Sequence, residues 1–303
     1  MSAQTLSTLR ACARHPLRIS GAAMTEGVEH QFHAAKKWGP FASLVLRLGE
    51  QASVRLPSTT MVVSKNLQKH YQSRYFNRVT YLPNGTIIRQ QRSTSRLAGW
   101  GLTARNYILF LGRFSPEKNC HLLIQAYEKV QTPVKLVFAG GSSHSDAYAG
   151  ELRNRQNENI RFLDWVSGDA LDELLTNAML FVLPSDIEGL SLALLDALGA
   201  GVCVLTSNIA ENCEVVEGAG FTFKRGDVND LERTLRWLIA DSSARLMAAE
   251  KAQQRVRENY LWPVIAKEVE RSYWRTMGRQ GVSVALPESP SSAEVGRLDL
   301  TAA

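Results

Sequence analysis

The chain has 303 residues, 45% of them hydrophobic, which is enough to bury a sizeable core in one or two domains. Its formal net charge of +6 is uneven, because residues 1–92 carry thirteen Lys or Arg and three Asp or Glu, whereas residues 93–303 carry twenty-two and twenty-six. A basic segment can face nucleic acid, anionic lipid or a phosphorylated substrate. No zinc finger, RNA-binding signature or Arg-rich helix with interleaved aromatic residues is present, which argues against nucleic acid as a partner.

The cysteines and histidines argue against a metal site. The four cysteines are Cys12, Cys120, Cys203 and Cys213. Neither they nor the six histidines have the spacing of metal ligands, so we expect reduced, buried thiols, no metal ion and a cytoplasmic location. The N-terminus lacks the apolar core of a signal peptide, and the longest apolar tract, 190–205, is interrupted by Asp196 and too short to span a bilayer. Any association with a membrane is therefore expected to be peripheral.

The N-terminal third predicts a small α/β unit followed by a linker. The elements expected in order are a helix at 36–56, a strand at 60–64, a helix at 65–73 and a strand at 79–83. In the first helix, apolar residues from Trp38 to Leu48 recur on one face. Asn84-Gly85 then predicts a turn. Residues 86–104 are rich in Arg, Ser, Gln, Thr and Gly, which is the composition of a linker.

Strands and helices alternate along the rest of the chain, which is typical of a parallel sheet. The expected strands are 107–111, 134–139, 160–163, 179–183 and 202–205, and the expected helices are 119–130, 169–178, 190–198, 228–240, 243–260 and 263–274. The strand at 179–183 is a continuous apolar run, as in a strand covered on both faces. Residues 281–303, with prolines near Ser and Glu, predict a disordered tail.

Two carboxylates follow the predicted strand at 179–183, one in the loop after it and one in the next predicted helix. Ligands of parallel sheets sit beyond the carboxyl ends of the strands, where a helix N-terminus favours an anion. Glu188 lies in the loop, and Asp196 is eight residues further on, about 12 Å along the helix axis. This spacing suits an extended ligand, with sugar hydroxyls on one acid, ribose hydroxyls on the other and phosphate on the helix N-terminus between them. A loop acid and a solvated helix acid without any ligand would have the same spacing.

A second group of polar residues follows the strand at 107–111. Gly112 permits close approach of the backbone, and Arg113 and Lys118 stand on either side of Pro116. Two cations in this arrangement can hold a diphosphate from two directions. A surface loop without a ligand can also contain an Arg and a Lys. The sequence has neither the glycine fingerprint of a nicotinamide enzyme nor a serine nucleophile elbow, which argues against both classes.

The stretch from Pro184 to Gly201 resembles the signature of retaining glycosyltransferases of family 4, in which seven residues separate two acids. Gly112-Arg113 and Glu117-Lys118 resemble the pattern at the head of the second domain of that family. The strand that ends in Ser64 and the exit Pro83-Asn84-Gly85 resemble the end of its first domain. Two positions differ, because the family usually has Glu where this chain has Asp196, and Gly where it has Asn119.

The resemblance implies an α/β protein of the GT-B type, with one complete Rossmann-like nucleotide-sugar-binding domain and a partial N-terminal Rossmann-like domain. The expected organisation is a partial acceptor-side domain at 1–85, a linker at 86–104, the nucleotide-sugar-binding domain at 105–260, a helix crossing back to the first domain at 261–280 and a disordered tail at 281–303. The implied activity is transfer of a hexose, with retention, from a nucleotide diphosphate sugar to a glycan or lipid-linked acceptor, as in polysaccharide biosynthesis, without a cofactor or metal.

The resemblance also assigns roles to the polar residues. Glu188 is the expected catalytic residue, which holds hydroxyls of the donor sugar, and Asp196 is the expected ribose ligand. The expected diphosphate ligands are Gly112, Arg113, Lys118, Gly189, Leu190 and Ser191. A basic N-terminal third suits peripheral association with an anionic surface at the inner face of the membrane, and a basic face that is only solvated would have the same composition.

The family's first domain begins with a strand and a Gly-rich loop, and neither is recognisable before Lys36. We therefore expect an N-terminally truncated chain that is a poor catalyst by itself. Two alternatives stay open: an inactive nucleotide-sugar-binding remnant, which would bind nucleotide without turnover, and a GT-B-fold sugar epimerase, which would change the donor sugar without an acceptor.

Overall fold

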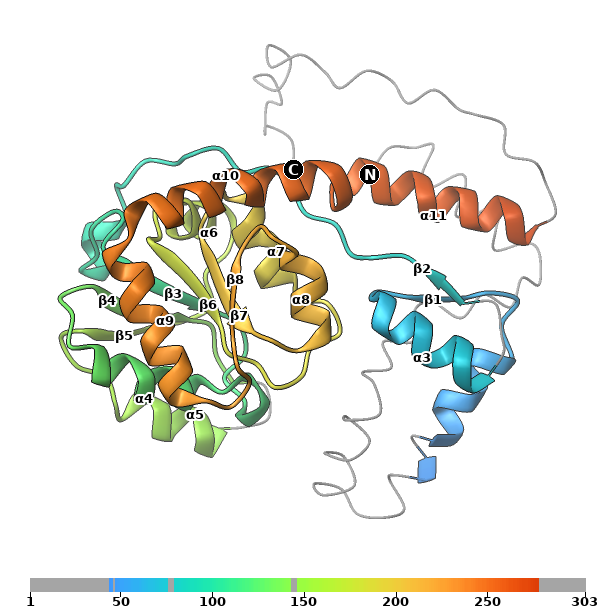
Figure 1. Ribbon diagram of the computed structural model, residues 1–303, viewed down its shortest axis with the longest axis horizontal. Coiled ribbons are helices and arrows are strands. Elements are labelled where there is room, and N and C mark those ends of the chain that lie inside the picture. The colour runs from blue at the N-terminus through green and yellow to red at the C-terminus, as the bar shows by residue number, and fades with distance from the viewer. Residues whose placement is uncertain (1–43, 46, 76–78, 143–145, 278–303) are drawn as a thin grey trace, which may run out of the picture.

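The computed structural model describes residues 44–45, 47–75, 79–142 and 146–277 (Figure 1). Of the helix expected at 36–56, residues 44, 45 and 47–55 are helical, and the remainder of its N-terminal part lies outside the described residues. The expected disordered tail and Cys12 also lie outside them.

The larger part of the molecule is built on a six-stranded sheet with the order β5-β4-β3-β6-β7-β8, in which every neighbouring pair is parallel. The strands are β3 (Tyr107–Leu111), β4 (Lys135–Ala139), β5 (Ile160–Leu163), β6 (Leu180–Leu183), β7 (Val204–Ser207) and β8 (Phe221–Phe223). β6 is buried along its whole length and so is most of β3, as their continuous apolar runs require. The predicted parallel α/β fold is confirmed.

Helices cover the sheet on both faces. They are α4 (Cys120–Val130), α5 (Asp146–Arg153), α6 (Gly168–Thr176), α7 (Leu192–Gly199), α8 (Ala210–Val216), α9 (Val228–Ala240) and α10 (Ser242–Asn259). The chain moves outward from β3 in one direction and from β6 in the other. Because crossovers between parallel strands are right-handed, the helices that follow β3 and β4 lie on one face, and those that follow β6 and β7 lie on the other. The strand order therefore reverses between β3 and β6.

Three short elements were not predicted from the sequence: α5, α8 and β8. Each has three to eight residues, and α5 contains Gly150, so their periodic patterns are short or interrupted. β7 also lies later than expected, because Gly201 turns the chain at a φ of 66° and the strand continues through two polar residues. Those two residues are buried, and their hydroxyls are satisfied there: Thr206 Oγ1 donates to Leu183 O at 3.0 Å, and Ser207 Oγ donates to Ser185 O at 2.5 Å.

The expectation of buried thiols holds for two of the three cysteines within the described residues. Cys120 and Cys203 are buried, and burial raises the pKa of the Cys203 thiol to about 12. Cys213 is exposed, so the prediction was wrong for this residue. Its place in the short helix α8 explains the difference, because α8 was not predicted and its faces could not be assigned.

A smaller unit precedes this sheet. β1 (Thr60–Val62) and β2 (Val79–Tyr81) are parallel neighbours, and α3 (Lys65–Tyr75) connects them. A separate cluster of buried residues, Val54, Val62, Leu67, Tyr71 and Val79, forms its core. The long helix α11 (Trp262–Thr276) runs from the larger part toward this unit (Figure 1), and the Thr276 and Thr59 hydroxyls lie 3.0 Å apart.

The chain passes between the two parts twice, at residues 82–90 and 260–262, and the two passes are paired. Thr86 and Leu261 form a parallel bridge, in which Thr86 N donates to Tyr260 O at 2.7 Å and Trp262 N donates to Thr86 O at 3.3 Å. The first pass also lies against the end of α7. A Cβ placed on Gly199 would stand 2.2 Å from Ile87 O, so only glycine allows this approach.

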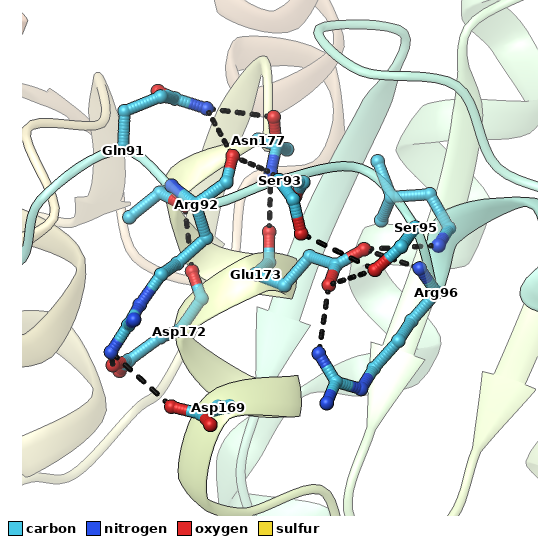
Figure 2. Close-up of polar contacts among 11 residues, drawn as sticks. Gln91, Arg92, Ser93, Ser95, Arg96, Asp169, Asp172, Glu173 and Asn177 are labelled. Carbon is cyan, nitrogen blue, oxygen red and sulfur yellow. Dashed lines mark hydrogen bonds and ion pairs between the residues drawn. The ribbon is translucent and has the colours of Figure 1, made fainter.

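The segment with the composition of a linker is fastened to α6 by hydrogen bonds along its length (Figure 2). Asn177 Nδ2, just after α6, donates to Ser93 O at 3.1 Å, and Arg92 forms ion pairs with Asp169 and Asp172 of the helix. The short helix η1 (Leu97–Trp100) ends the segment.

Glu173 of α6 makes the most buried of these contacts, with 1% of its side chain exposed. Its carboxylate accepts from Arg96 N at 2.6 Å and from Leu97 N at 3.3 Å, and it pairs with the Arg96 guanidinium at 3.1 Å. Burial alone would raise the pKa of this carboxyl, but these donors lower it more, so its pKa lies below the ordinary 4.5. The charged form therefore stabilises the fold.

We expect Glu173→Gln to lower the free energy of unfolding at pH 7, and the difference from the unchanged protein to shrink as the pH falls. The sign follows from a folded-state pKa below the unfolded one, since the stabilisation is present above pH 4.5 and is lost as pH falls through the lowered pKa. Urea unfolding at pH 7 and pH 4 measures it. Asp169→Asn is the control, because the Asp169 side chain is 70% exposed. An equal loss at both pH values would contradict the role of the charge.

Candidate functional site

Two loops meet where the strand order reverses. The loop after β3 contains Gly112 to Lys118, and the loop after β6 contains Pro184 to Ser191. β3 and β6 pair directly in parallel, so both loops leave the same edge of the sheet. Asp186 N donates to Glu117 O at 2.9 Å, which joins the loops through their backbones. In open parallel sheets this is where ligands bind.

Lys118 and Glu188 form an ion pair across these loops. Lys118 Nζ lies 2.6 Å from Glu188 Oε1, and 15% and 7% of the two side chains are exposed. The sequence predicted both as site residues but placed them on different groups of one ligand, the diphosphate and the sugar. Lys118 can donate to phosphate, and Glu188 can accept from hydroxyl groups. The two side chains lie one hydrogen-bond length apart.

Asn119 positions Lys118. Its φ of 52° is left-handed, and Asn119 N donates to Pro116 O at 3.0 Å to close the short helix η2 (Pro116–Lys118). Glycine adopts this conformation most readily and asparagine tolerates it, which accounts for Asn where the glycosyltransferase pattern usually has Gly. Asn119 also adds a contact that glycine lacks, because Nδ2 donates to Pro184 O at 3.2 Å in the other loop.

The other predicted diphosphate ligands lie in the same two loops. Gly112, at a φ of 150°, ends β3, and its N–H donates to Ala139 O at 3.0 Å. Arg113 is exposed and forms no hydrogen bond or ion pair with the described part of the chain. It is therefore available to an external anion.

Gly189, Leu190 and Ser191 lead into α7. Ser191 is the N-cap of this helix, and its Oγ accepts from Leu194 N at 3.3 Å. The first turn of α7 contains no acidic residue, so its positive end is not offset by a side chain of its own. The helix N-terminus thus stands beside Glu188, at the end of the loop that carries it.

Asp196 lies elsewhere on α7 and does not contact Lys118 or Glu188. Its Oδ1 accepts from Thr86 Oγ1 at 2.7 Å and pairs with Arg89 Nη1 at 3.0 Å. Arg89 Nε also donates to Asp172 Oδ1 at 2.8 Å. Thr86 and Arg89 were not predicted, because they stand about 110 positions before Asp196 in a segment without any recognisable pattern.

Buried polar residues below the β6 loop also escaped prediction. Ser207 Oγ donates to Ser185 O, and Asn212 Nδ2 donates to Ser207 Oγ at 3.1 Å. Ser185, Ser207 and Asn212 are all buried. These contacts hold the backbone of the loop from beneath, and a buried polar network of this kind fixes one loop conformation.

Within the described residues, no group of three or more His, Cys, Asp or Glu is arranged to hold a metal ion. No helix in the described ranges is both long and apolar enough to cross a membrane.

Several solved structures share this fold. A sucrose-phosphate synthase from Thermosynechococcus elongatus superposes with a TM-score of 0.74 at 20% identity, covering 90% of this chain and 71% of that one. The Anabaena protein HepE, solved in complex with UDP-glucose, superposes with a TM-score of 0.70 at 19% identity, covering 82% and 70%. Together with WaaG, a glycosyltransferase involved in lipopolysaccharide biosynthesis, they confirm the predicted GT-B fold.

Proteins similar in sequence also include glycosyltransferases. The chain is 28% identical over 183 residues to O-antigen chain mannosyltransferase B of Escherichia coli, covering 58% of this chain and 48% of the relative. It is 29% identical over 200 residues to glycogen synthase of Mycobacterium tuberculosis, covering 62% and 48%. The chain thus spans about half the length of these curated relatives. The family described as Glycosyl transferases group 1 matches residues 100–255, more than half of the chain and both loops of the site, and the chain belongs to that family.

Proposed function

We propose that this chain carries the donor site of a retaining glycosyltransferase, which moves a hexose from a nucleotide diphosphate sugar to a glycan or lipid-linked acceptor. The contact between Lys118 and Glu188 is the observation that carries the proposal, because a cation of the kind that binds phosphate lies beside a carboxylate of the kind that accepts from hydroxyls, in the loop that leads into a helix N-terminus. Family membership supports it. A UDP-sugar is the donor to test first, since HepE was solved with UDP-glucose.

In this mechanism, Arg113, Lys118 and the N-terminus of α7 bind the diphosphate and stabilise the negative charge that develops on it as it leaves. Glu188 accepts hydrogen bonds from the donor sugar. The bond between the anomeric carbon and the phosphate oxygen breaks, and a bond from that carbon to the acceptor oxygen forms on the same face. The proton of the acceptor hydroxyl passes to the departing phosphate, so the chain need not supply a separate base.

Asp196 is proposed to bind the ribose. One of its oxygens is already bonded to Thr86 and Arg89, while 25% of its side chain stays exposed. Asp196 is the fifth residue of α7, about 6 Å along the axis from Leu192, so it lies just over one turn from the helix N-terminus at which the phosphates are proposed to bind, closer than the two turns expected from the sequence.

A cytoplasmic location with peripheral membrane contact also belongs to the proposal. In the helical residues before β1, Leu44, Val45 and Leu48 are more than half exposed. Arg47 and Arg55 of the same stretch are also exposed. Apolar side chains beside cations suit the interface of an anionic bilayer, where a lipid-linked acceptor would lie.

We expect Arg113→Ala and Lys118→Ala each to weaken nucleoside diphosphate binding by about 1.5–3 kcal/mol, the size of a charge-assisted hydrogen bond. Titration calorimetry with UDP, ADP and GDP measures this. Lys129→Ala is the matched control, because Lys129 lies at the far end of α4 and contacts Asn229. Unchanged affinity in both loop variants would defeat the diphosphate assignment.

We expect Glu188→Gln to abolish sugar transfer while leaving nucleotide affinity nearly intact, because its contacts are assigned to the sugar. Asp196→Asn should instead weaken nucleotide binding. Transfer assays with and without acceptor, run beside calorimetry, separate the two effects. Equal losses of nucleotide affinity would show that the ends of the ligand are misassigned. Donor conversion without acceptor would favour the epimerase, and binding without turnover would favour the inactive remnant.

We expect vesicles that contain anionic lipid to sediment the protein, and added salt to release it, with about 1 kcal/mol contributed by each nearby Lys or Arg. The double variant Arg47→Glu and Arg55→Glu should bind less. The double variant Lys251→Glu and Arg257→Glu on α10 is the control, because it makes the same change in charge on another exposed face. Sedimentation that is independent of anionic lipid would remove the membrane proposal.

A further inference from the structure

Asp196 is held from outside its own helix by the segment that connects the two parts of the molecule. Thr86 is buried, and its hydroxyl donates to Asp196 Oδ1. Arg89, with 10% of its side chain exposed, contacts the same oxygen through Nη1. Arg89 Nη1 also donates to Thr86 Oγ1 at 3.3 Å, so the three groups form one closed cluster.

The backbone fixes Thr86 and Arg89 in place. Both backbone groups of Thr86, its N–H and its C=O, are hydrogen-bonded to residues 260–262, where the chain passes back between the two parts. Arg89 N donates to Gly199 O at 2.9 Å, at the last residue of α7. Main-chain contacts therefore hold the connecting segment against α7. The side chains of Thr86 and Arg89 reach Asp196 from backbone positions that these contacts fix.

The contacts on Asp196 are one-sided. Thr86 Oγ1 donates to Oδ1 and Arg89 Nη1 pairs with the same oxygen, whereas no hydrogen bond from the described residues reaches Oδ2. A carboxylate that is hydrogen-bonded through one oxygen keeps its plane and its charge, and its second oxygen can still accept two hydrogen bonds. The side chain of Asp has only two rotatable bonds, and the cluster restricts both, so Oδ2 is presented in one direction.

We propose that Thr86 and Arg89 are positioning residues for the ribose end of the donor site: they orient Asp196 through Oδ1 so that Oδ2 accepts from a ribose hydroxyl. This inference rests on the proposed function, in which Asp196 binds the ribose. Neither residue touches the donor. They determine how strongly the site distinguishes a ribonucleotide from a nucleotide that lacks the hydroxyl, because a preorganised acceptor loses less entropy when it binds.

The experiment compares the affinities for UDP, 2′-deoxy-UDP and 3′-deoxy-UDP by titration calorimetry on the full chain. ADP and GDP with their deoxy forms replace them if UDP does not bind. The variants are Thr86→Val, which removes the donor and keeps the shape, Thr86→Ser, which restores it, and Arg89→Lys, which keeps the charge. Arg92→Lys is the control, because Arg92 leaves the same segment and contacts Asp172 but not Asp196. Thermal unfolding verifies that each variant is folded.

For the unchanged protein, we expect the loss of one ribose hydroxyl to weaken binding about tenfold, as for a hydrogen bond to a charged group. That ratio should fall to about threefold or less in Thr86→Val and Arg89→Lys, and should be retained in Thr86→Ser and Arg92→Lys. A merely structural role would weaken the ribonucleotide and its deoxy forms equally and leave the ratio unchanged.

The outcomes separate this inference from the function on which it rests. If the ratio is lost in Asp196→Asn but retained in Thr86→Val and Arg89→Lys, the positioning role is overturned and the ribose role of Asp196 stands. If the unchanged protein does not distinguish the deoxy forms, the ribose role is wrong and the positioning role falls with it. Absence of binding by every nucleoside diphosphate would overturn the donor site as a whole.

Discussion

The direct parallel pairing of β3 with β6 is the constraint on which the site depends. The two strands are separated in sequence by two strands and three α-helices. In the sheet, the other neighbour of β3 is β4 and the other neighbour of β6 is β7, so the chain continues from the two strands in opposite directions. Since the strands run parallel, the loops that follow them leave the sheet together. Lys118 and Glu188 meet only because of this, since each loop supplies one member of the pair and Lys118 Nζ lies 2.6 Å from Glu188 Oε1.

Three partly or fully buried carboxylates of the described residues hold separate segments of the chain together. Glu188 is paired with Lys118, Asp196 with Arg89, and Glu173 with Arg96 and two backbone N–H groups. Each carboxylate would be costly to bury alone, and each partner comes from a distant part of the sequence. The last two tie the connecting segment to α6 and α7, whereas the first stays at the edge of the sheet. The ion pair of Lys118 with Glu188 is therefore separate from the contacts that hold the segment joining the two parts of the molecule.

The spacing of apolar residues in the sequence was sufficient to predict those helices and strands in which the apolar residues are the buried ones. β3 and α9 begin and end at the predicted residues, because an uninterrupted apolar run and a strong amphipathic repeat each determine one structure. α5, α8 and β8 were missed since they are too short to show a period. β7 was displaced because Thr206 and Ser207 are polar, and only their hydrogen bonds to Leu183 O at the end of β6 and to Ser185 O in the following loop make them suitable for a buried strand.

The sequence by itself determined the parallel α/β class, the candidate loops after β3 and β6, and the residue types that could bind phosphate and hydroxyl groups, because these depend on patterns a few residues long. The tertiary structure decided which of these residues meet. It placed Lys118 against Glu188, gave Asn119 the left-handed conformation that glycine would take, and brought Thr86 and Arg89 to Asp196. Contacts across more than a hundred positions leave no periodic trace in a single sequence, since they follow from strand order and from the return of the chain at residues 260–262.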